Sequence, residues 1–285
     1  MNIHDDKVKK LEKIAVKVRE DIIEMLLEAK SGHSAGPLGM ADIFTAFYFH
    51  ILHHDPKHPE WEERDRLILS NGHICPVRYA TMVEAGYFPR SYLKTLRKFG
   101  SKFQGHPERL RCPGLETTSG PLGSGLSQAA GMAYGARMDS KTWRTYCLTS
   151  DAEHGCGIFW EAVMFAGKYK LNNLTIVIDR NNIEIDGNTE DIMPLEPLRD
   201  KYEAFNWHVI DVSGHDIAAF VGAIEEAKTI FEKPTVIIAH TIPGRGVPFM
   251  ENKFEWHGLP PNAEQAREAM HALRTLEGRI KSEHE

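Results

Sequence analysis

The chain has 285 residues, of which 42% are hydrophobic and 26% are charged, and its formal net charge is −6. These values are ordinary for a globular chain of one large domain or two small ones, and the acidic balance gives no sign of nucleic-acid binding. The sequence has neither an apolar run long enough to span a bilayer nor the apolar core of a signal peptide. Its four cysteines form no CxxC pair, so we interpret them as reduced thiols of a cytoplasmic protein.

The first predicted element is an amphipathic helix over residues 5–30, with apolar side chains at steps of three and four and Gly32 as its expected stop. A glycine-rich turn follows and carries His33. A second helix is expected over residues 41–51. A histidine in such a turn can be a plain surface residue, but a loop position also leaves it free to face a ligand.

Two more histidines follow in loops. Residues 67–69 read as a short strand that ends near His73, and Pro76 is a good first-turn residue for the next helix. Because a helix N-terminus disfavours an imidazolium, His73 is expected to be neutral. His106 lies in the loop sequence QGHPE. A glycine-rich loop and a helix of small residues come next, over residues 114–137, and the small residues alone predict only close packing.

A strand–helix–strand unit in the middle of the chain carries the strongest pattern. Residues 146–148 and 174–178 are apolar strands, and Asp151 and Asn181 follow them, thirty positions apart. A right-handed crossover brings the carboxyl ends of such strands to one edge, where ligands bind. A carboxylate and an amide oxygen suit Mg²⁺. The simpler alternative is that these residues are a helix cap and a turn residue.

Two further strands are predicted over residues 207–212 and 235–239, with a helix between them over residues 217–231. Asn262 is expected to cap a final helix that ends in an exposed, charged tail. The alternation of strands and helices predicts an α/β fold in three layers, with a mostly parallel sheet flanked by helices.

The sequences around these positions resemble the transketolase family. Asp151 with Asn181 resembles its thiamine diphosphate motif, usually written Gly-Asp-Gly…Asn. Family-like segments occur in family order, namely SGHSAGPLGMADI, LSNGH, QGHPE, TTSGPLGSGLSQAAGMA, WEAVMFAGKYKLNNL and IDRNNIEIDG. Ser150 and Ala152 replace the two glycines of the motif. Cys156 stands where many transketolases have a glutamate that helps to link paired active sites.

The resemblance implies the thiamine-diphosphate-binding fold and a set of cofactor contacts. Mg²⁺, for which Ca²⁺ or Mn²⁺ can substitute, is expected on Asp151, Asn181 and the backbone carbonyl of Ile183. The implied cofactor-binding residues are His73, Gly120, Pro121, Leu122, Asp151, Ala152, Asn181 and His257.

The resemblance also implies how the substrate is handled. His33, His106 and His257 are expected to contact the substrate and to act as general acid/base groups. The short sequence Trp256-His257-Gly258 carries the assignment of His257. Glu161 corresponds to a glutamate that takes part in a carboxylate and water link between active sites. The simpler alternative is that Glu161 is a solvent-exposed carboxylate on a helix.

Residues 1–285 match only the first part of a single-chain transketolase, so we expect one domain that binds the diphosphate and Mg²⁺. The pyrimidine-binding domain, with the glutamate that protonates the aminopyrimidine, and the C-terminal domain are expected on a partner chain. The implied assembly is an α2β2 heterotetramer that acts on sugar phosphates, with no nucleic-acid or membrane partner.

The implied reaction is transfer of a two-carbon ketol unit from a ketose phosphate to an aldose phosphate, as in pentose phosphate metabolism. Three alternatives remain open. The chain could belong to another thiamine diphosphate enzyme, such as a 2-oxo acid dehydrogenase or a 1-deoxyxylulose-phosphate synthase. It could serve a transketolase specialised for an unusual sugar. It could also be a non-catalytic, cofactor-holding subunit, which only Ala152 and Cys156 support.

Overall fold

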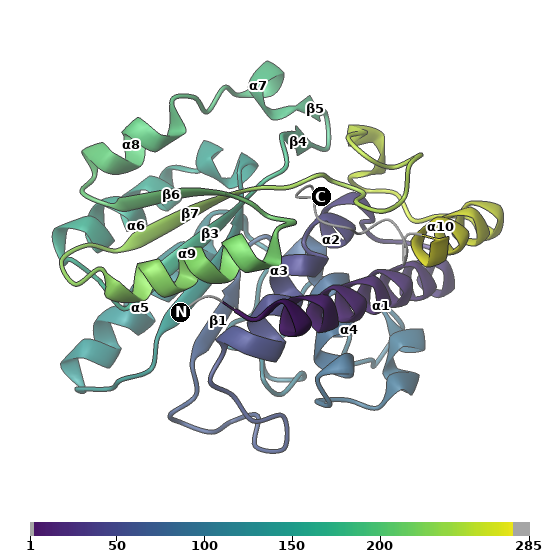
Figure 1. The fold of residues 1–285 in the computed structure, drawn as a ribbon, viewed down its shortest axis with the longest axis horizontal. Helices are drawn as coiled ribbons and strands as arrows, with labels where there is room; N and C mark the ends of the chain where they lie inside the picture. Colours follow the sequence, from purple (N-terminus) through teal and green to yellow (C-terminus); the bar gives the residue numbers. More distant parts are fainter. Residues whose placement is uncertain (1–2, 276–285) are drawn as a thin grey trace.

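The computed structural model describes residues 3–275 and confirms the predicted α/β sheet. Five strands lie in the order β1-β2-β3-β7-β6, and all neighbouring pairs are parallel (Figure 1). These strands are β1 (Arg66–Leu69), β2 (Thr145–Ser150), β3 (Leu174–Arg180), β6 (His208–Ser213) and β7 (Thr235–His240). A short antiparallel hairpin, β4 (Ile183–Glu184) with β5 (Gly187–Asn188), lies beyond the end of β3.

Helices connect and cover these strands. The longer ones are α1 (Asp5–Ala29), α4 (Cys75–Glu84), α5 (Ser124–Met138), α6 (Gly157–Lys168), α9 (Ile217–Thr229) and α10 (Ala263–Thr275). The shorter ones are α2 (Ala35–Gly39), α3 (Ala41–Ala46), α7 (Thr189–Ile192) and α8 (Leu198–Ala204). Asn262 caps α10, as predicted, because its side chain accepts the backbone N–H groups of Glu264 and Gln265. The charged tail predicted after α10 lies outside the described residues.

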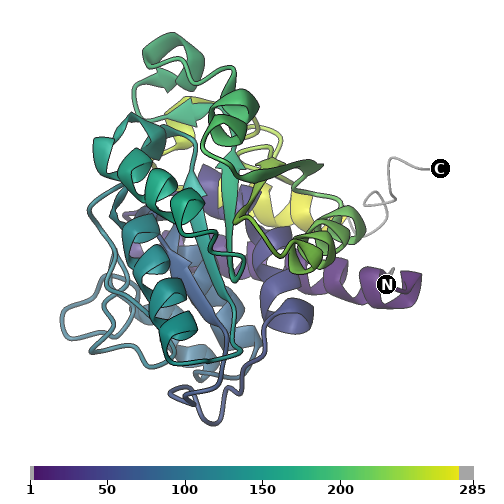
Figure 2. The ribbon, with the colours of Figure 1, turned by 90° about the vertical axis from the view of Figure 1, so that its left-hand side faces the viewer.

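The sheet separates two apolar cores, and Figures 1 and 2 show from two directions the helices on its two faces. Alternate side chains of each strand point to opposite faces, so Ile176 and Ile178 join one core while Val177 joins the other. Helices α5, α6 and α8 cover the first face, and α1, α3, α4 and α9 pack on the second. Every residue of β2 and β3 is buried, as expected for parallel strands covered on both faces.

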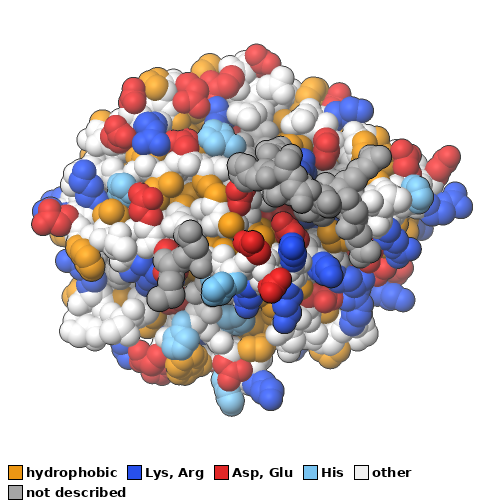
Figure 3. All heavy atoms as spheres, viewed as in Figure 1, with side chains coloured by type: hydrophobic (Ala, Val, Ile, Leu, Met, Phe, Trp, Pro, Cys, Tyr) orange, Lys and Arg blue, Asp and Glu red, His pale blue; other side chains and the backbone are white. Residues whose placement is uncertain are grey.

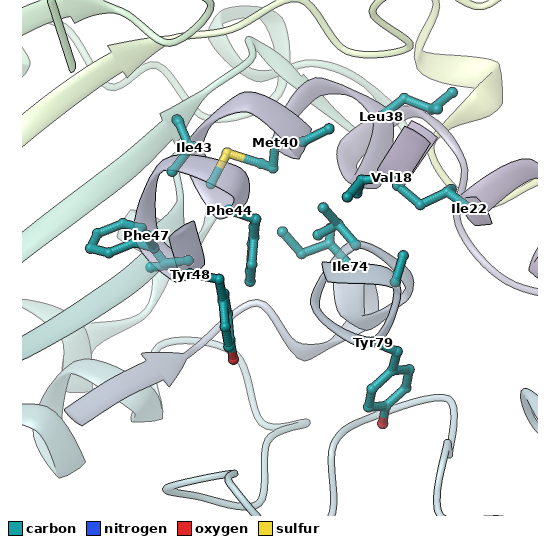
Figure 4. Close-up of a cluster of buried hydrophobic side chains, with 14 of the residues drawn as sticks. Val18, Ile22, Leu38, Met40, Ile43, Phe44, Phe47, Tyr48, Ile74 and Tyr79 are labelled. Atoms are coloured by element: carbon teal, nitrogen blue, oxygen red, sulfur yellow. The ribbon is translucent and has the colours of Figure 1, made fainter. Parts of the chain in front are cut away.

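The N-terminal helices form a dense core beside the sheet (Figure 4). Val18 and Ile22 of α1 and Phe44 of α3 belong to this core, and all three are fully buried. A buried ion pair joins the same helices, since the guanidinium of Arg19 donates to Asp42 at 2.6 and 3.1 Å. Burial alone would raise the pKa of Asp42, but Arg19 and a hydrogen-bonded histidine hold that pKa well below its usual range.

One predicted helix differs from the structure in where it ends, and another differs in its hydrogen-bond pattern. The first helix ends at Ala29, because Lys30 adopts a left-handed conformation with φ of 52° and donates its N–H to Leu26, ahead of Gly32. The helix predicted over residues 41–51 continues beyond α3 as a π-helical turn (Phe47–Ile51), closed by a hydrogen bond from the N–H of Leu52 to Phe47. Apolar periodicity does not separate these hydrogen-bond patterns.

The surface carries both signs of charge. On the face shown in Figure 3, acidic and basic side chains are interspersed. No helix within residues 3–275 is both long enough and apolar enough to cross a membrane.

Candidate active site at the carboxyl ends of the strands

Two neighbouring strands end at the same edge of the sheet and present polar residues there. In the parallel register of β2 and β3, Ser150 lies beside Asp179. The backbone N–H of Asp151 donates to the carbonyl of Asp179 at 3.3 Å, and Asn181 follows two residues later. The crossover therefore brings Asp151 and Asn181 to one edge, as the strand–helix–strand pattern predicted.

The carboxylate of Asp151 is fully buried, and its two oxygens are used unequally. Oδ2 accepts from Arg180 Nη1 at 3.0 Å, from the backbone N–H of Asn182 at 2.9 Å and from the Thr189 hydroxyl at 3.4 Å. Within residues 3–275, Oδ1 accepts only the backbone N–H of Ala152, at 2.8 Å. Burial raises the pKa of Asp151, and the Arg180 guanidinium opposes that rise. Oδ1 is therefore the oxygen with room for a ligand.

Asn181 is held by two hydrogen bonds that fix its amide orientation. Its Nδ2 donates to Asp179 at 2.7 Å, and its Oδ1 accepts the backbone N–H of Ile183 at 3.0 Å. The hydroxyl of Thr241 donates to the other oxygen of Asp179. Burial raises the pKa of Asp179 to about 7. The Asn181 amide oxygen keeps one lone pair for a further partner.

These oxygen atoms suit a hard divalent cation. A carboxylate oxygen, an amide oxygen and a backbone carbonyl are ligands that Mg²⁺ accepts, and Mg²⁺ commonly completes its octahedron with phosphate oxygens and water. In the part of the chain that the structure describes, no three His, Cys, Asp or Glu side chains are placed so that they could hold a metal ion by themselves. The site thus fits a cation that arrives with an oxygen-rich ligand.

Ala152 fills its glycine position without backbone strain. The residue does not adopt a positive φ, and it begins the 3₁₀ turn Ala152–Gly155. Its N–H is the group that holds Oδ1 of Asp151. The conformational freedom of glycine is therefore not needed here, although a methyl group remains where a glycine would leave space.

Glu153, for which the sequence predicted no role, joins three loops beneath the site. This buried carboxylate accepts the hydroxyl of Ser70, the backbone N–H of Gly123 at 2.7 Å and the backbone N–H of Ser150 at 2.8 Å. The Ser70 hydroxyl also accepts the N–H of Gly125 at 3.1 Å. The end of β1, the glycine-rich loop and the end of β2 are thereby held together. No local sequence signal could reveal a pairing of residues 70 and 153.

The glycine-rich loop leaves its predicted contact residues uncovered. A Cβ atom at Gly120 would meet no described atom within 4 Å, and the φ of this residue is 154°. Pro121 is exposed, and Leu122 is 44% exposed although it is apolar. The backbone and one apolar side chain are thus available to a ligand or a partner.

Three of the predicted histidines meet in one cluster. The ring centroids of His33 and His73 are 4.9 Å apart, those of His33 and His257 are 5.6 Å apart, and those of His73 and His257 are 5.1 Å apart. His106 lies beside them, because a Cβ atom on Gly72 would come within 3.3 Å of its ring. Residues from four loops that are far apart in the sequence are therefore brought together.

Their surroundings keep these imidazoles neutral. Burial lowers the pKa of His33 to about 4, and the neighbouring His257, Arg97 and His106 add to the effect. Burial likewise lowers the pKa of His73, His106 and His257. A neutral imidazole offers one donor and one acceptor, so each ring of the cluster can both donate and accept a hydrogen bond.

Two buried polar groups near this cluster lack partners. Nδ1 of His33 and both amide atoms of Asn71 have no hydrogen bond within the described residues. An unsatisfied buried polar group costs about 1–3 kcal/mol. Asn71 belongs to the LSNGH sequence, in which only His73 was predicted to bind a ligand. Such groups at a strand end indicate a polar ligand that completes their hydrogen bonds.

Glu161 is not brought to the cluster. It lies on an exposed part of α6, and it forms no hydrogen bond or ion pair with any residue in 3–275. Any role for this side chain must involve a group outside the described chain.

Known proteins are similar to this chain in both sequence and fold. Residues 11–276 match the family described as the thiamine diphosphate binding domain of transketolase. The chain is 39% identical over 263 residues to a subunit of the apulose-4-phosphate transketolase of Phocaeicola vulgatus, covering 92% of this chain and 93% of that protein. It is 40% identical over 256 residues to 6-deoxy-6-sulfo-D-fructose transketolase subunit SqwG of a Clostridium species, covering 90% and 93%.

Longer transketolases match over part of their length. A solved transketolase from Pichia stipitis superimposes with a TM-score of 0.88 at 34% identity, covering 94% of this chain and 40% of that chain. The human transketolase is 38% identical over 259 residues, which are 89% of this chain and 40% of that protein. The similarity thus spans nearly all of the two transketolase subunits and less than half of these longer chains.

The half-buried ring of His33 predicts a pH dependence of stability. The pKa of His33 is about 4 in the folded chain, whereas an unfolded histidine has a pKa near 6.5. Between these values the unfolded state binds a proton that the folded state does not bind. The free energy of unfolding should therefore fall as the pH is lowered from about 6.5 to about 4. Urea denaturation at several pH values measures this, and His33→Asn should show a shallower fall. Equal slopes would contradict it.

Proposed function

The chain belongs to the transketolase thiamine diphosphate binding family, and from this premise we propose that it is the diphosphate-binding subunit of a two-chain transketolase. The enzyme transfers a two-carbon ketol unit from a ketose phosphate to an aldose phosphate. One observation carries the proposal. A cluster of neutral histidines, with His73 just after β1, lies at the same end of the parallel sheet as Asp151 Oδ1 and Asn181 Oδ1, each of which accepts one hydrogen bond. The similarity, over nearly their whole length, to proteins that are named as transketolase subunits supports the two-chain organisation.

Thiamine diphosphate with Mg²⁺ is the proposed cofactor. Asp151 Oδ1, Asn181 Oδ1 and the backbone carbonyl of Ile183 hold the cation. His73, His257 and the segment 120–122, together with Ala152, contact the cofactor itself. When bound, thiamine diphosphate supplies the nucleophilic carbon and the electron sink of the reaction. The unpartnered amide of Asn71 supports a polar ligand at this place.

The remaining histidines handle the substrate. His33 and His106 hydrogen-bond the sugar hydroxyls and exchange protons with them, and His257 serves both substrate and cofactor. Their lowered pKa values support a neutral state near pH 7, in which each ring can accept a hydrogen bond from a hydroxyl. Glu161 is proposed to reach a second active site through the assembly rather than within this chain.

The partner is proposed to be a C-terminal transketolase chain that carries the pyrimidine-binding domain, in an α2β2 assembly in the cytoplasm. Exposed apolar side chains near the site support a covering chain. Leu122 is 44% exposed, Ile158 is 45% exposed and Met164 is 55% exposed. The free cysteines of the described chain support a reducing compartment.

Two sugar substrates are candidates, and an assay distinguishes them. Xylulose 5-phosphate with ribose 5-phosphate is the pair of pentose phosphate metabolism. An unusual sugar is the second candidate, because two similar proteins are named for apulose 4-phosphate and for 6-deoxy-6-sulfo-D-fructose. Comparing kcat/KM for these donors decides between them.

The first test is binding and turnover. Calorimetric titration of thiamine diphosphate with Mg²⁺ should give binding in the presence of the partner chain, because the proposed site is shared between two chains. Turnover of a sugar phosphate should require both chains. Cofactor binding without turnover would favour a cofactor-holding subunit, and no binding in either condition would overturn the proposal.

A second test separates substrate from cofactor contacts. His33→Ala and His106→Ala should lower turnover by about 10²–10⁴-fold, the range for loss of a general acid or base. Cofactor affinity should change far less, because these rings are proposed to face the sugar. His73→Ala is the matched comparison and should weaken cofactor binding. Equal losses of turnover and affinity in the first two variants would sink their assignment.

The Asn71 amide, which lacks a hydrogen-bond partner within the described residues, gives a third test. In this test stability and cofactor affinity should change in opposite directions. Asn71→Leu replaces an unsatisfied buried amide with an apolar group of similar size. The cofactor-free protein should gain about 1 kcal/mol of unfolding free energy, because the burial penalty disappears. Cofactor affinity should fall. Thermal denaturation and calorimetry measure the two effects. A more stable variant with unchanged affinity would show that Asn71 does not contact the cofactor.

A further inference from the structure

Arg180 connects the proposed metal ligand to a segment outside the sheet. Its side chain is 4% exposed. Nη1 donates to Asp151 Oδ2 at 3.0 Å, while Nη2 donates to Glu190 at 2.5 Å and to Glu196 at 3.1 Å. Glu190 lies in α7, and Glu196 precedes α8. One guanidinium therefore joins the end of β3, the loop after β2 and the segment 188–197.

This contact decides which oxygen of Asp151 is available. With Arg180, Asn182 and Thr189 all donating to Oδ2, that atom has no lone pair to spare. Oδ1 carries a single hydrogen bond, from Ala152. A cation at this carboxylate is thereby directed to Oδ1, and a bidentate arrangement is excluded.

The local charge still favours a divalent cation. One guanidinium faces three carboxylates, those of Asp151, Glu190 and Glu196, so the group retains excess negative charge. Arginine suits the role because its planar fork presents separate N–H groups to partners on opposite sides. The positive charge of a lysine is concentrated on one compact ammonium group, which cannot contact all three carboxylates in the same way.

We propose that Arg180 is a positioning residue of the metal site, which occupies Oδ2 of Asp151 and so presents Oδ1 to the cation and its diphosphate. In this role the contact of Nη1 with Asp151 is the essential one, whereas Glu190 and Glu196 contact the other nitrogen, Nη2. The inference rests on the proposed function, since that function supplies the cation and the diphosphate.

A simpler role for Arg180 is to anchor segment 188–197 to the sheet. Two sets of variants distinguish these roles. Glu190→Gln with Glu196→Gln weakens the anchor while the contact with Asp151 remains. Arg180→Met removes both contacts, and Arg180→Lys keeps the charge but loses the fork. If Arg180 positions Asp151, metal affinity should fall in the variants that lose the contact with Asp151. If Arg180 only anchors the segment, metal affinity should fall in the variant that loses the contacts with the two glutamates.

Electron paramagnetic resonance of Mn²⁺ measures the affinity directly, with thiamine diphosphate and the partner chain present. Outer-shell partners of metal ligands typically contribute about 10–100-fold to metal affinity. Arg180→Met should therefore weaken Mn²⁺ binding at least about tenfold, with Arg180→Lys in between and the double glutamine variant within about threefold of the unmodified protein. Circular dichroism and thermal denaturation confirm that each variant is folded.

Four outcomes decide between these roles. Mn²⁺ affinity of Arg180→Met within about twofold of the unmodified protein overturns the inference, as does an equal loss in the double glutamine variant. If Arg180→Met does not fold, Arg180→Lys takes its place, and unchanged affinity in that variant overturns the inference as well. Absence of Mn²⁺ binding to the unmodified protein would instead overturn the proposed function, so the two failures are distinguishable.

Discussion

The burial of one carboxylate at the end of β2 is the constraint on which the site depends. Asp151 has no exposed surface, and a buried charge is costly unless it is paired and hydrogen-bonded. The chain meets this requirement with Arg180, two backbone N–H groups and a hydroxyl. These donors come from three segments, so satisfying the carboxylate also fixes where β3, the 3₁₀ turn and α7 lie relative to one another.

In the histidine cluster, burial has the opposite effect on charge. Here burial removes charge, because closely packed imidazoles cannot all be protonated in a low-dielectric site. One edge of the sheet therefore holds a charged oxygen group that suits a cation beside uncharged rings that suit hydroxyls. This division of polarity follows from burial and from the partners of each group.

Much of this could be predicted from the sequence, and the exceptions share a cause. Strand periodicity and the crossover rule placed Asp151 and Asn181 together, and the loop sequences placed His33, His73 and His257. Glu153 was missed because its partner Ser70 lies 83 positions away, in a pairing that no spacing rule describes. The contact of Arg180 with Asp151 was missed because a strand-end arginine usually faces solvent. Local patterns predict elements and motifs, whereas long-range hydrogen bonds follow from the packing of those elements.

Two departures from the family motif, Ala152 and Cys156, have different consequences. The first concerns a backbone hydrogen bond, and the second concerns a side-chain charge. Ala152 replaces a glycine whose φ is not used, and its N–H still serves Asp151, so the backbone part of the motif survives the change. Cys156 replaces a carboxylate, and no backbone group can supply the missing charge. Burial raises the pKa of this thiol, which is therefore neutral near pH 7 and a weak hydrogen-bond partner. At the position where many transketolases have a carboxylate, this chain therefore offers a neutral thiol. The motif thus keeps its backbone hydrogen bond at position 152 and loses a charge at position 156.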